Sequence, residues 1–72
     1  MKKEGYLVWD GNMQRPDIKF NDGSYYGGLN CGSVLEALIN DKWINTRLEL
    51  NDKENFYLVG IGEEILWQKV RI

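Results

Sequence analysis

The chain has 72 residues, of which 43% are hydrophobic and 28% are charged, and its formal net charge is −2. A chain of this length forms one domain that buries about 60% of the surface exposed by its unfolded form, which leaves no room for a deep active-site cleft. The composition differs from that of disordered chains, and the small negative charge gives no electrostatic reason for the domain, residues 1–72, to bind DNA or an anionic membrane.

The first half of the chain predicts short strands separated by turns. Residues 6–9 are rich in β-formers and are followed by the turn sequence Asp-Gly-Asn, and residues 18–20 predict a second short strand. Pro16 has no amide proton, so residues 13–20 suit a sheet edge or an irregular connection better than a central strand. After a turn at 21–24, residues 25–32 predict an interrupted strand, because two tyrosines favour a strand while three glycines weaken it.

The clearest element is a β-hairpin over residues 34–49, with Asn40 and Asp41 as a two-residue turn. The register places Leu38 opposite Trp43. One face then forms part of the core, and its members are Leu35, Ala37, Ile39, Ile44, Thr46, Leu48 and Leu50. The other face is mixed and carries Val34, Glu36, Leu38, Trp43, Asn45, Arg47 and Glu49.

An alternative for the first arm of this hairpin is a short helix. The sequence from Ser33 to Glu36 fits a capping box, in which Ser33 caps a backbone amide and Glu36 reaches back to the amide of Ser33. That helix would have to end at Asn40, and seven residues are too few for a helix to support itself. The pattern therefore favours a strand.

The last third begins with a polar turn at 51–55 and predicts two more strands, at residues 56–61 and 65–72, with a loop at 62–64 between them. Alternation in the final strand places Trp67 on the same face as Lys69 and Arg71. Short strands punctuated by turns indicate a mostly β protein, either a small antiparallel β-barrel or a rolled sheet of SH3-like size. Rolling the sheet also protects edges that a flat sheet would expose.

The residue inventory disfavours an enzyme and a metal site. The chain has no His, which removes the usual general base near neutral pH and the commonest zinc ligand. The acidic residues lack the spacing of a calcium loop. A single Cys31 excludes an intramolecular disulfide and a zinc knuckle, and alternation predicts a half-buried, packed thiol. We therefore predict no catalytic residue, no metal and no cofactor.

The same observations predict a location. One cysteine, the lack of a secretory signal pattern, and apolar runs far too short to span a membrane indicate a cytoplasmic protein.

Aromatic residues are the one enrichment with functional content, with three Trp and four Tyr in 72 residues. Some must fill the core, but exposed Trp, Tyr and Arg dominate protein-binding hot spots. We predict a protein-binding patch made of Leu38, Trp43, Arg47, Trp67, Lys69 and Arg71. A homodimer contact through the apolar surface near Leu38 and Trp43 is a second use of the same patch.

A competing function is binding of single-stranded nucleic acid. Trp43 and Trp67 would stack on bases, and the phosphates would be held by Lys42, Arg47, Lys69 and Arg71. The acidic charge balance of the chain counts against this alternative.

Five segments in the last two thirds of the chain resemble a family of small uncharacterised bacterial proteins, a domain of unknown function found mostly in Gram-positive bacteria and their mobile elements. These segments are Leu-Asn-Cys-Gly-Ser at 29–33, Leu-Ile-Asn-Asp-Lys-Trp at 38–43, Thr-Arg-Leu-Glu at 46–49, Phe-Tyr-Leu-Val-Gly at 56–60 and Lys-Val-Arg-Ile at 69–72. The family prefers Asn-Gly or Gly-Lys at the hairpin tip, where this chain has Asn40-Asp41.

The resemblance implies a compact β protein in a mobile-element setting, where small proteins bind larger ones and block or adapt them. Together with the small size and acidity of the chain, the resemblance predicts a more specific role, that of an inhibitor of a host-defence nuclease, as anti-CRISPR proteins are.

Overall fold

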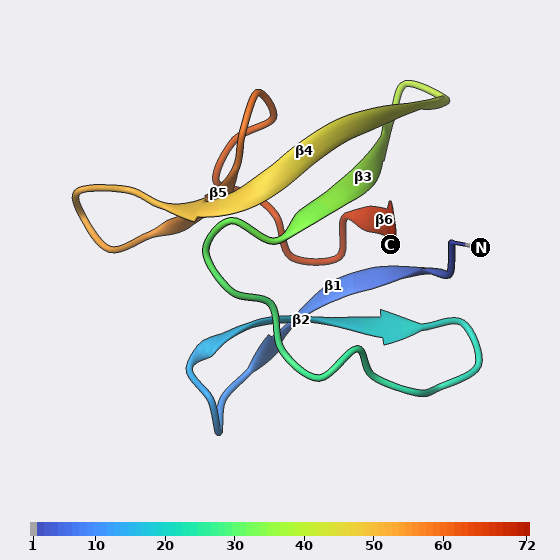
Figure 1. The fold of residues 1–72 in the computed structure, drawn as a ribbon, viewed down its shortest axis with the longest axis horizontal. Coiled ribbons are helices and arrows are strands. Elements are labelled where there is room, and N and C mark those ends of the chain that lie inside the picture. Colours follow the sequence, from blue (N-terminus) through green and yellow to red (C-terminus); the bar gives the residue numbers. More distant parts are fainter. Residues whose placement is uncertain (1) are drawn as a thin grey trace.

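The computed structural model describes residues 2–72, which form six β-strands in one sheet (Figure 1). The strands are β1 (Glu4–Asp10), β2 (Arg15–Phe20), β3 (Val34–Ile39), β4 (Lys42–Leu50), β5 (Phe56–Leu58) and β6 (Lys69–Arg71). Their order in the sheet is β2-β1-β6-β3-β4-β5, and each neighbouring pair is antiparallel. Residues 2–72 contain no helix, and hence none long and apolar enough to cross a membrane.

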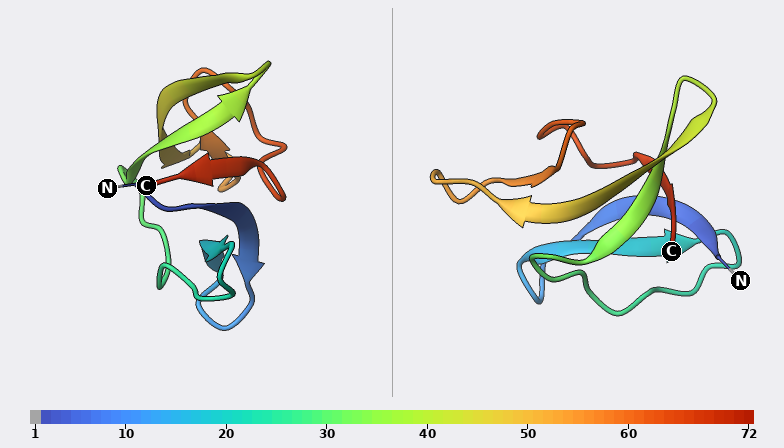
Figure 2. Two further views of the ribbon diagram at one scale, coloured as in Figure 1. Left: turned by 90° about the vertical axis from the view of Figure 1, so that its right-hand side faces the viewer. Right: turned by 45° about the horizontal axis from the view of Figure 1, so that its top comes forward.

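The sheet is rolled but not closed. The β1–β2 hairpin and the β3–β4 hairpin face each other, and the short strand β6 joins them on the side where both termini lie (Figure 2). Strands β2 and β5 remain the two edges of the sheet. The predicted fold class, a small antiparallel rolled sheet, is confirmed, and Pro16 lies in the edge strand β2 as predicted.

The inner face of the roll holds the core. Its buried apolar residues are Leu7, Ile18, Phe20, Leu29, Leu35, Ala37, Leu48, Leu58, Ile65 and Val70. Strand β1 crosses β2 so closely at Gly5 that a Cβ there would collide with the Lys19 carbonyl oxygen and lie 2.8 Å from the Phe20 Cα. Only glycine fits at this crossing.

The predicted hairpin forms with the predicted register, from Val34 opposite Arg47 to Ile39 opposite Lys42. Asn40 and Asp41 both have positive φ, +50° and +65°, which is the conformation of a type I′ turn. The alternative helix does not form, because strand β3 pairs with β4 on one side and with β6 on the other.

The predicted core face of this hairpin is right in its middle and wrong at its ends. The buried members are Leu35, Ala37, Thr46 and Leu48, and Ile39 is half-buried. Ile44 and Leu50, in contrast, are 40% and 42% exposed. They lie near the two ends of the long strand β4, beyond the centre of the roll, where alternation continues but no apolar layer faces it.

The predicted interrupted strand at residues 25–32 is wrong. Only Tyr25 makes a β-bridge, to Lys19, and the segment continues as a loop along the free edge of β2. Gly27 and Gly28 have φ values of +111° and +101°, which an extended strand does not contain. Cys31, at the end of this loop, is exposed rather than half-buried, because strand alternation does not apply there.

The last two strands are shorter than predicted. After β5, the Ile61 amide donates to the Leu58 carbonyl and closes a turn. Before β6, the Gln68 amide donates to the Ile65 carbonyl, and Trp67 has a φ of +68°. Extended alternation therefore begins only at Lys69, so the pattern that placed Trp67 on the face of Lys69 and Arg71 does not reach position 67.

Candidate functional site

The structure separates the six predicted patch residues into two places. Strands β3, β4 and β6 carry five of them, namely Leu38, Trp43, Arg47, Lys69 and Arg71. Trp67 lies in the turn before β6 and lines a hollow with residues of β1, β2 and the loop after β2. Five of the predicted patch residues therefore lie on paired strands, and Trp67 lies outside them.

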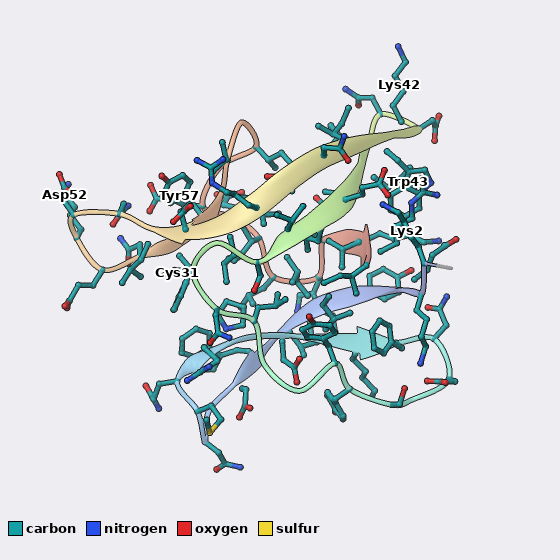
Figure 3. All side chains as sticks on the ribbon, viewed as in Figure 1. Lys2, Cys31, Lys42, Trp43, Asp52 and Tyr57 are labelled. Carbon is teal, nitrogen blue, oxygen red and sulfur yellow. The ribbon has the colours of Figure 1, made fainter. Side chains whose placement is uncertain are left out.

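Trp43 is covered by a guanidinium from the same chain. The Arg71 Cζ lies 4.3 Å from the centroid of the Trp43 ring. The Nε and Nη2 atoms of Arg71 donate to the two carboxylate oxygens of Glu36 over 2.9 and 3.3 Å. The Lys2 ammonium also contacts the carboxylate of Glu36, and the Glu36 side chain is only 12% exposed. We call these four residues, Glu36, Trp43, Arg71 and Lys2, the Trp43 cluster. Figure 3 labels two of them, Lys2 and Trp43, at the right of the view.

The charges in the Trp43 cluster satisfy one another. Hydrogen bonds from Arg71 and then from Lys2 lower the pKa of Glu36 from its usual 4.5 to about 2. Because Arg71 already has an anionic partner and a ring to stack on, little of its binding capacity is left for another molecule.

The other basic residues proposed to hold phosphates are also mostly paired. The Arg47 Nε lies 2.7 Å from a Glu49 carboxylate oxygen, and the Lys69 ammonium lies 3.5 Å from one of Glu4. Lys42, at the hairpin tip, takes part in no ion pair within residues 2–72. Phosphates would have to compete with carboxylates at most of the predicted positions.

Trp67 contributes to a surface that we call the outer aromatic groove. It is a hollow of about 350 Å³ lined by Val8, Trp9, Lys19, Tyr25, Leu66 and Trp67. Trp67 is 72% exposed, the highest value among the exposed large hydrophobic residues of the described chain, and Tyr25 is 58% exposed. The Lys19 ammonium lies 6.0 Å from the centroid of the Tyr25 ring. Three aromatic rings thus face solvent around one shallow depression.

Asp17 positions the loop that carries Tyr25. Its carboxylate is buried, and one oxygen accepts hydrogen bonds from the amides of Ile18, Gly27 and Gly28 over 2.8, 3.0 and 2.8 Å. Their positive φ values make these two glycines suited to directing both amides at one acceptor. Sequence reasoning missed Asp17; the signal that pointed to it was the Gly27-Gly28 pair, which requires an acceptor for two adjacent amides.

The backbone of Trp67 is in a conformation that favours glycine. Its φ is +68°, and the turn is fixed because the Trp67 amide donates to the Leu7 carbonyl over 2.6 Å. A bulky residue in this region costs about 1 kcal/mol relative to glycine. Because the ring is also the most exposed of the large hydrophobic side chains described, fold stability does not account for a tryptophan at this position.

A second hollow, which we call the mouth pocket, lies at the end of the roll where the β1–β2 and β4–β5 turns approach each other. Its volume is about 570 Å³, and it shares Trp9 and Leu66 with the outer aromatic groove. The rings of Trp9 and Phe56 meet there with centroids 6.1 Å apart and planes tilted by 60°. Glu54 and Glu63 bring two carboxylates to its lining.

Residues 2–72 contain no group of three or more His, Cys, Asp or Glu side chains placed to hold a metal ion. Trp9 and Leu66 join the mouth pocket and the outer aromatic groove into one aromatic surface.

These features define a small all-β protein with exposed aromatic side chains on a rolled sheet. The chain belongs to the family described as a domain of unknown function, DUF5348, whose model matches residues 5–72. It is similar to a protein from Ruminococcus gnavus, a structural genomics target with a crystal structure, at 37% sequence identity and a TM-score of 0.86. The alignment covers 97% of this chain and 100% of that one. No curated protein matched the sequence. The predicted membership of an uncharacterised bacterial family is confirmed.

Proposed function

We propose that the protein is a non-enzymatic interaction module that binds another protein through the outer aromatic groove. The observation that carries this proposal is Trp67, a 72% exposed ring held on a backbone with a φ of +68°. Glycine would relieve the strain of this backbone conformation, and the exposed ring adds little to the fold, so we assign the ring a use outside the fold. Trp9 and Tyr25 lie in the same groove and supply further anchors of the residue types that dominate binding hot spots.

The contact surface proposed here is a revision of the predicted patch. Trp67 stays in it, while the Trp43 cluster is left out because its members bind one another. Three partly exposed rings around a shallow hollow suit the smaller, transient class of protein interfaces.

The family resemblance adds a finer role. We propose that the bound protein is a larger host protein that this module inhibits or adapts, in the cytoplasm of a bacterium and from a mobile element. The acidic charge balance and the small size of the chain support the role of an inhibitor, which is a prediction.

Site-specific photocrosslinking in bacterial cells tests the proposed surface. A photoreactive residue in place of Leu66, on the groove, is compared with one in place of Val34, which is 67% exposed and lies outside it. We expect a discrete protein adduct from position 66, no matching adduct from position 34, and loss of the first when Trp67→Gly is added. Equal adducts from both positions, or none from position 66, would overturn the proposal.

A titration with oligonucleotides separates this function from single-strand binding. Tryptophan fluorescence is followed at low and high salt, and we expect no saturable change. Quenching that falls steeply with added salt would show phosphate contacts and overturn the protein-binding assignment in favour of nucleic acid.

A further inference from the structure

We propose that the mouth pocket receives an arginine side chain from the bound protein. This inference rests on the proposed function, because the pocket and the outer aromatic groove share Trp9 and Leu66, so that one bound segment would reach both. The pocket volume of about 570 Å³ is ample for one long side chain.

The floor of the pocket suits a flat cation. Trp9 is 47% exposed, and its ring meets that of Phe56 with centroids 6.1 Å apart. A guanidinium stacks on such faces through both its charge and its planar shape, and it is more weakly hydrated than an ammonium. An apolar wall from Ile65 and Leu66 would contact the methylene groups of the same side chain.

The rim of the pocket is anionic and has no cation of its own. Glu54 and Glu63 line it, neither takes part in an ion pair within residues 2–72, and none of the described residues that line it is Lys or Arg. The turn that carries Glu54 is closed by hydrogen bonds, since the Asn51 side-chain oxygen accepts from the amides of Lys53 and Asn55 over 2.9 and 3.0 Å. One carboxylate is therefore presented on a preorganised turn.

The molecule already contains the combination that the pocket lacks. In the Trp43 cluster a guanidinium lies between an indole ring and the carboxylate of Glu36, with Arg71 as its source. The mouth pocket supplies an indole and two carboxylates but no guanidinium. Charge complementarity thus assigns the missing cation to the partner, in the same pairing of groups.

Negative charge also extends beyond the pocket. The β4–β5 turn and the loop before Ile65 add Asp52 and Glu64 to the two pocket carboxylates, against a single base, Lys53. Figure 3 shows Asp52 at this end of the molecule and Lys2 and Lys42 toward the opposite end. A basic segment would be drawn to the pocket end of the chain.

Two small probes test the inference on the full chain. Isotope-edited NMR spectra follow the indole N–H of Trp9 during addition of N-acetyl-L-arginine amide or of N-acetyl-L-citrulline amide, which has the same shape without the charge. We expect the arginine probe to shift this signal with a dissociation constant on the order of millimolar, and to lose affinity with added salt. The citrulline probe should bind at least about fivefold more weakly.

Charge variants locate the effect. The double variant Glu54→Gln, Glu63→Gln should weaken the arginine probe about tenfold, whereas Glu64→Gln, a neighbouring exposed acid that does not line the pocket, should leave it unchanged. Equal shifts by both probes, or an unaltered double variant, would overturn the arginine assignment. If the Leu66 crosslink persists in that case, the proposed function stands and only the ligand chemistry fails. If the crosslink is also absent, both fail.

Discussion

Trp43 of β4 lies under Arg71 at the end of β6, whereas Trp67 lies in the turn before β6, and the two tryptophans differ in what covers them. Trp43 lies under Arg71, which Glu36 holds in place. Trp67 has no such cover from the described residues and is 72% exposed. The Trp43 cluster thus stabilises the sheet, and the outer aromatic groove is open to another molecule.

An aromatic residue beside basic ones on a β face therefore does not by itself mark a binding site. What decides is whether a carboxylate from a third strand reaches the same place. Strand β6 sets Arg71 opposite Glu36 of β3, and this pairing joins residues 35 positions apart in the chain. Within residues 2–72, no cation lies over the Trp67 ring.

The largest expected effect concerns the strand crossing that supports the Trp43 end. Gly5→Ala should destabilise the protein by about 3 kcal/mol, because the added methyl group meets the backbone of Lys19 and Phe20. Gly11→Ala, in the turn at the other end of β1, is the control, since a Cβ there meets nothing within 4 Å. Urea unfolding measures both. Equal losses would show that the two ends of β1 do not differ in tightness.

The comparison itself is tested by removing each indole. Trp43→Ala should cost about 2 kcal/mol of unfolding free energy, because it removes a half-buried ring and its contact with Arg71. Trp67→Gly should leave stability within about 0.5 kcal/mol of the unmodified protein, since lost ring contacts are offset by relief of the positive φ. A loss at position 67 as large as that at position 43 would contradict the distinction between the two surfaces.

Acid should reduce the contribution of the Trp43 cluster to the stability of the fold. The pKa of Glu36 is about 2 in the folded protein against 4.5 ordinarily, so its carboxylate stabilises the fold above pH 4.5 and this contribution is lost as pH falls from 4.5 toward 2. We expect the melting temperature to fall across that window, and the fall to be shallower in Glu36→Gln, which should melt lower at pH 7.

Asp22 provides the control for this acid effect. Hydrogen bonds from Ser24 also lower the pKa of Asp22, but that side chain is exposed. Asp22→Asn should therefore change the acid profile less than Glu36→Gln does. An acid profile that Glu36→Gln leaves unaltered would remove the carboxylate from the account of the Trp43 cluster.

The smallest expected effect is at the hairpin tip. Asp41 has a φ of +65°, so Asp41→Gly should raise stability by about 0.5 kcal/mol through relief of this strain, partly offset by the greater freedom of glycine in the unfolded chain. Thermal unfolding detects the change. A destabilised variant would show that the Asp41 side chain contributes more than its backbone costs.

Local patterns predicted much of the fold and little of the site. Alternation and a two-residue turn gave the register from Val34 to Arg47, because neighbouring residues along the chain determine which side chains face each other in a hairpin. The same reasoning failed at residues 65–68, where a turn closed by Gln68 replaces the strand. Three apolar residues at 65–67 favour a strand, but the Trp67 amide donates to the Leu7 carbonyl of β1 from within a turn.

The sequence alone was enough to predict a mostly β fold, a small barrel or rolled sheet, with its central hairpin, since these follow from turn residues and period-two patterning that act over a few positions. The family was predicted separately, from the resemblance of five segments. Only the tertiary structure decided which tryptophan is free. Trp43 is covered by Arg71, which pairs with Glu36 of a different strand. The loop that carries Tyr25 is held by Asp17 of the edge strand β2. The partners of these residues are fixed by the order of strands in the sheet, which residue patterns within single strands do not encode.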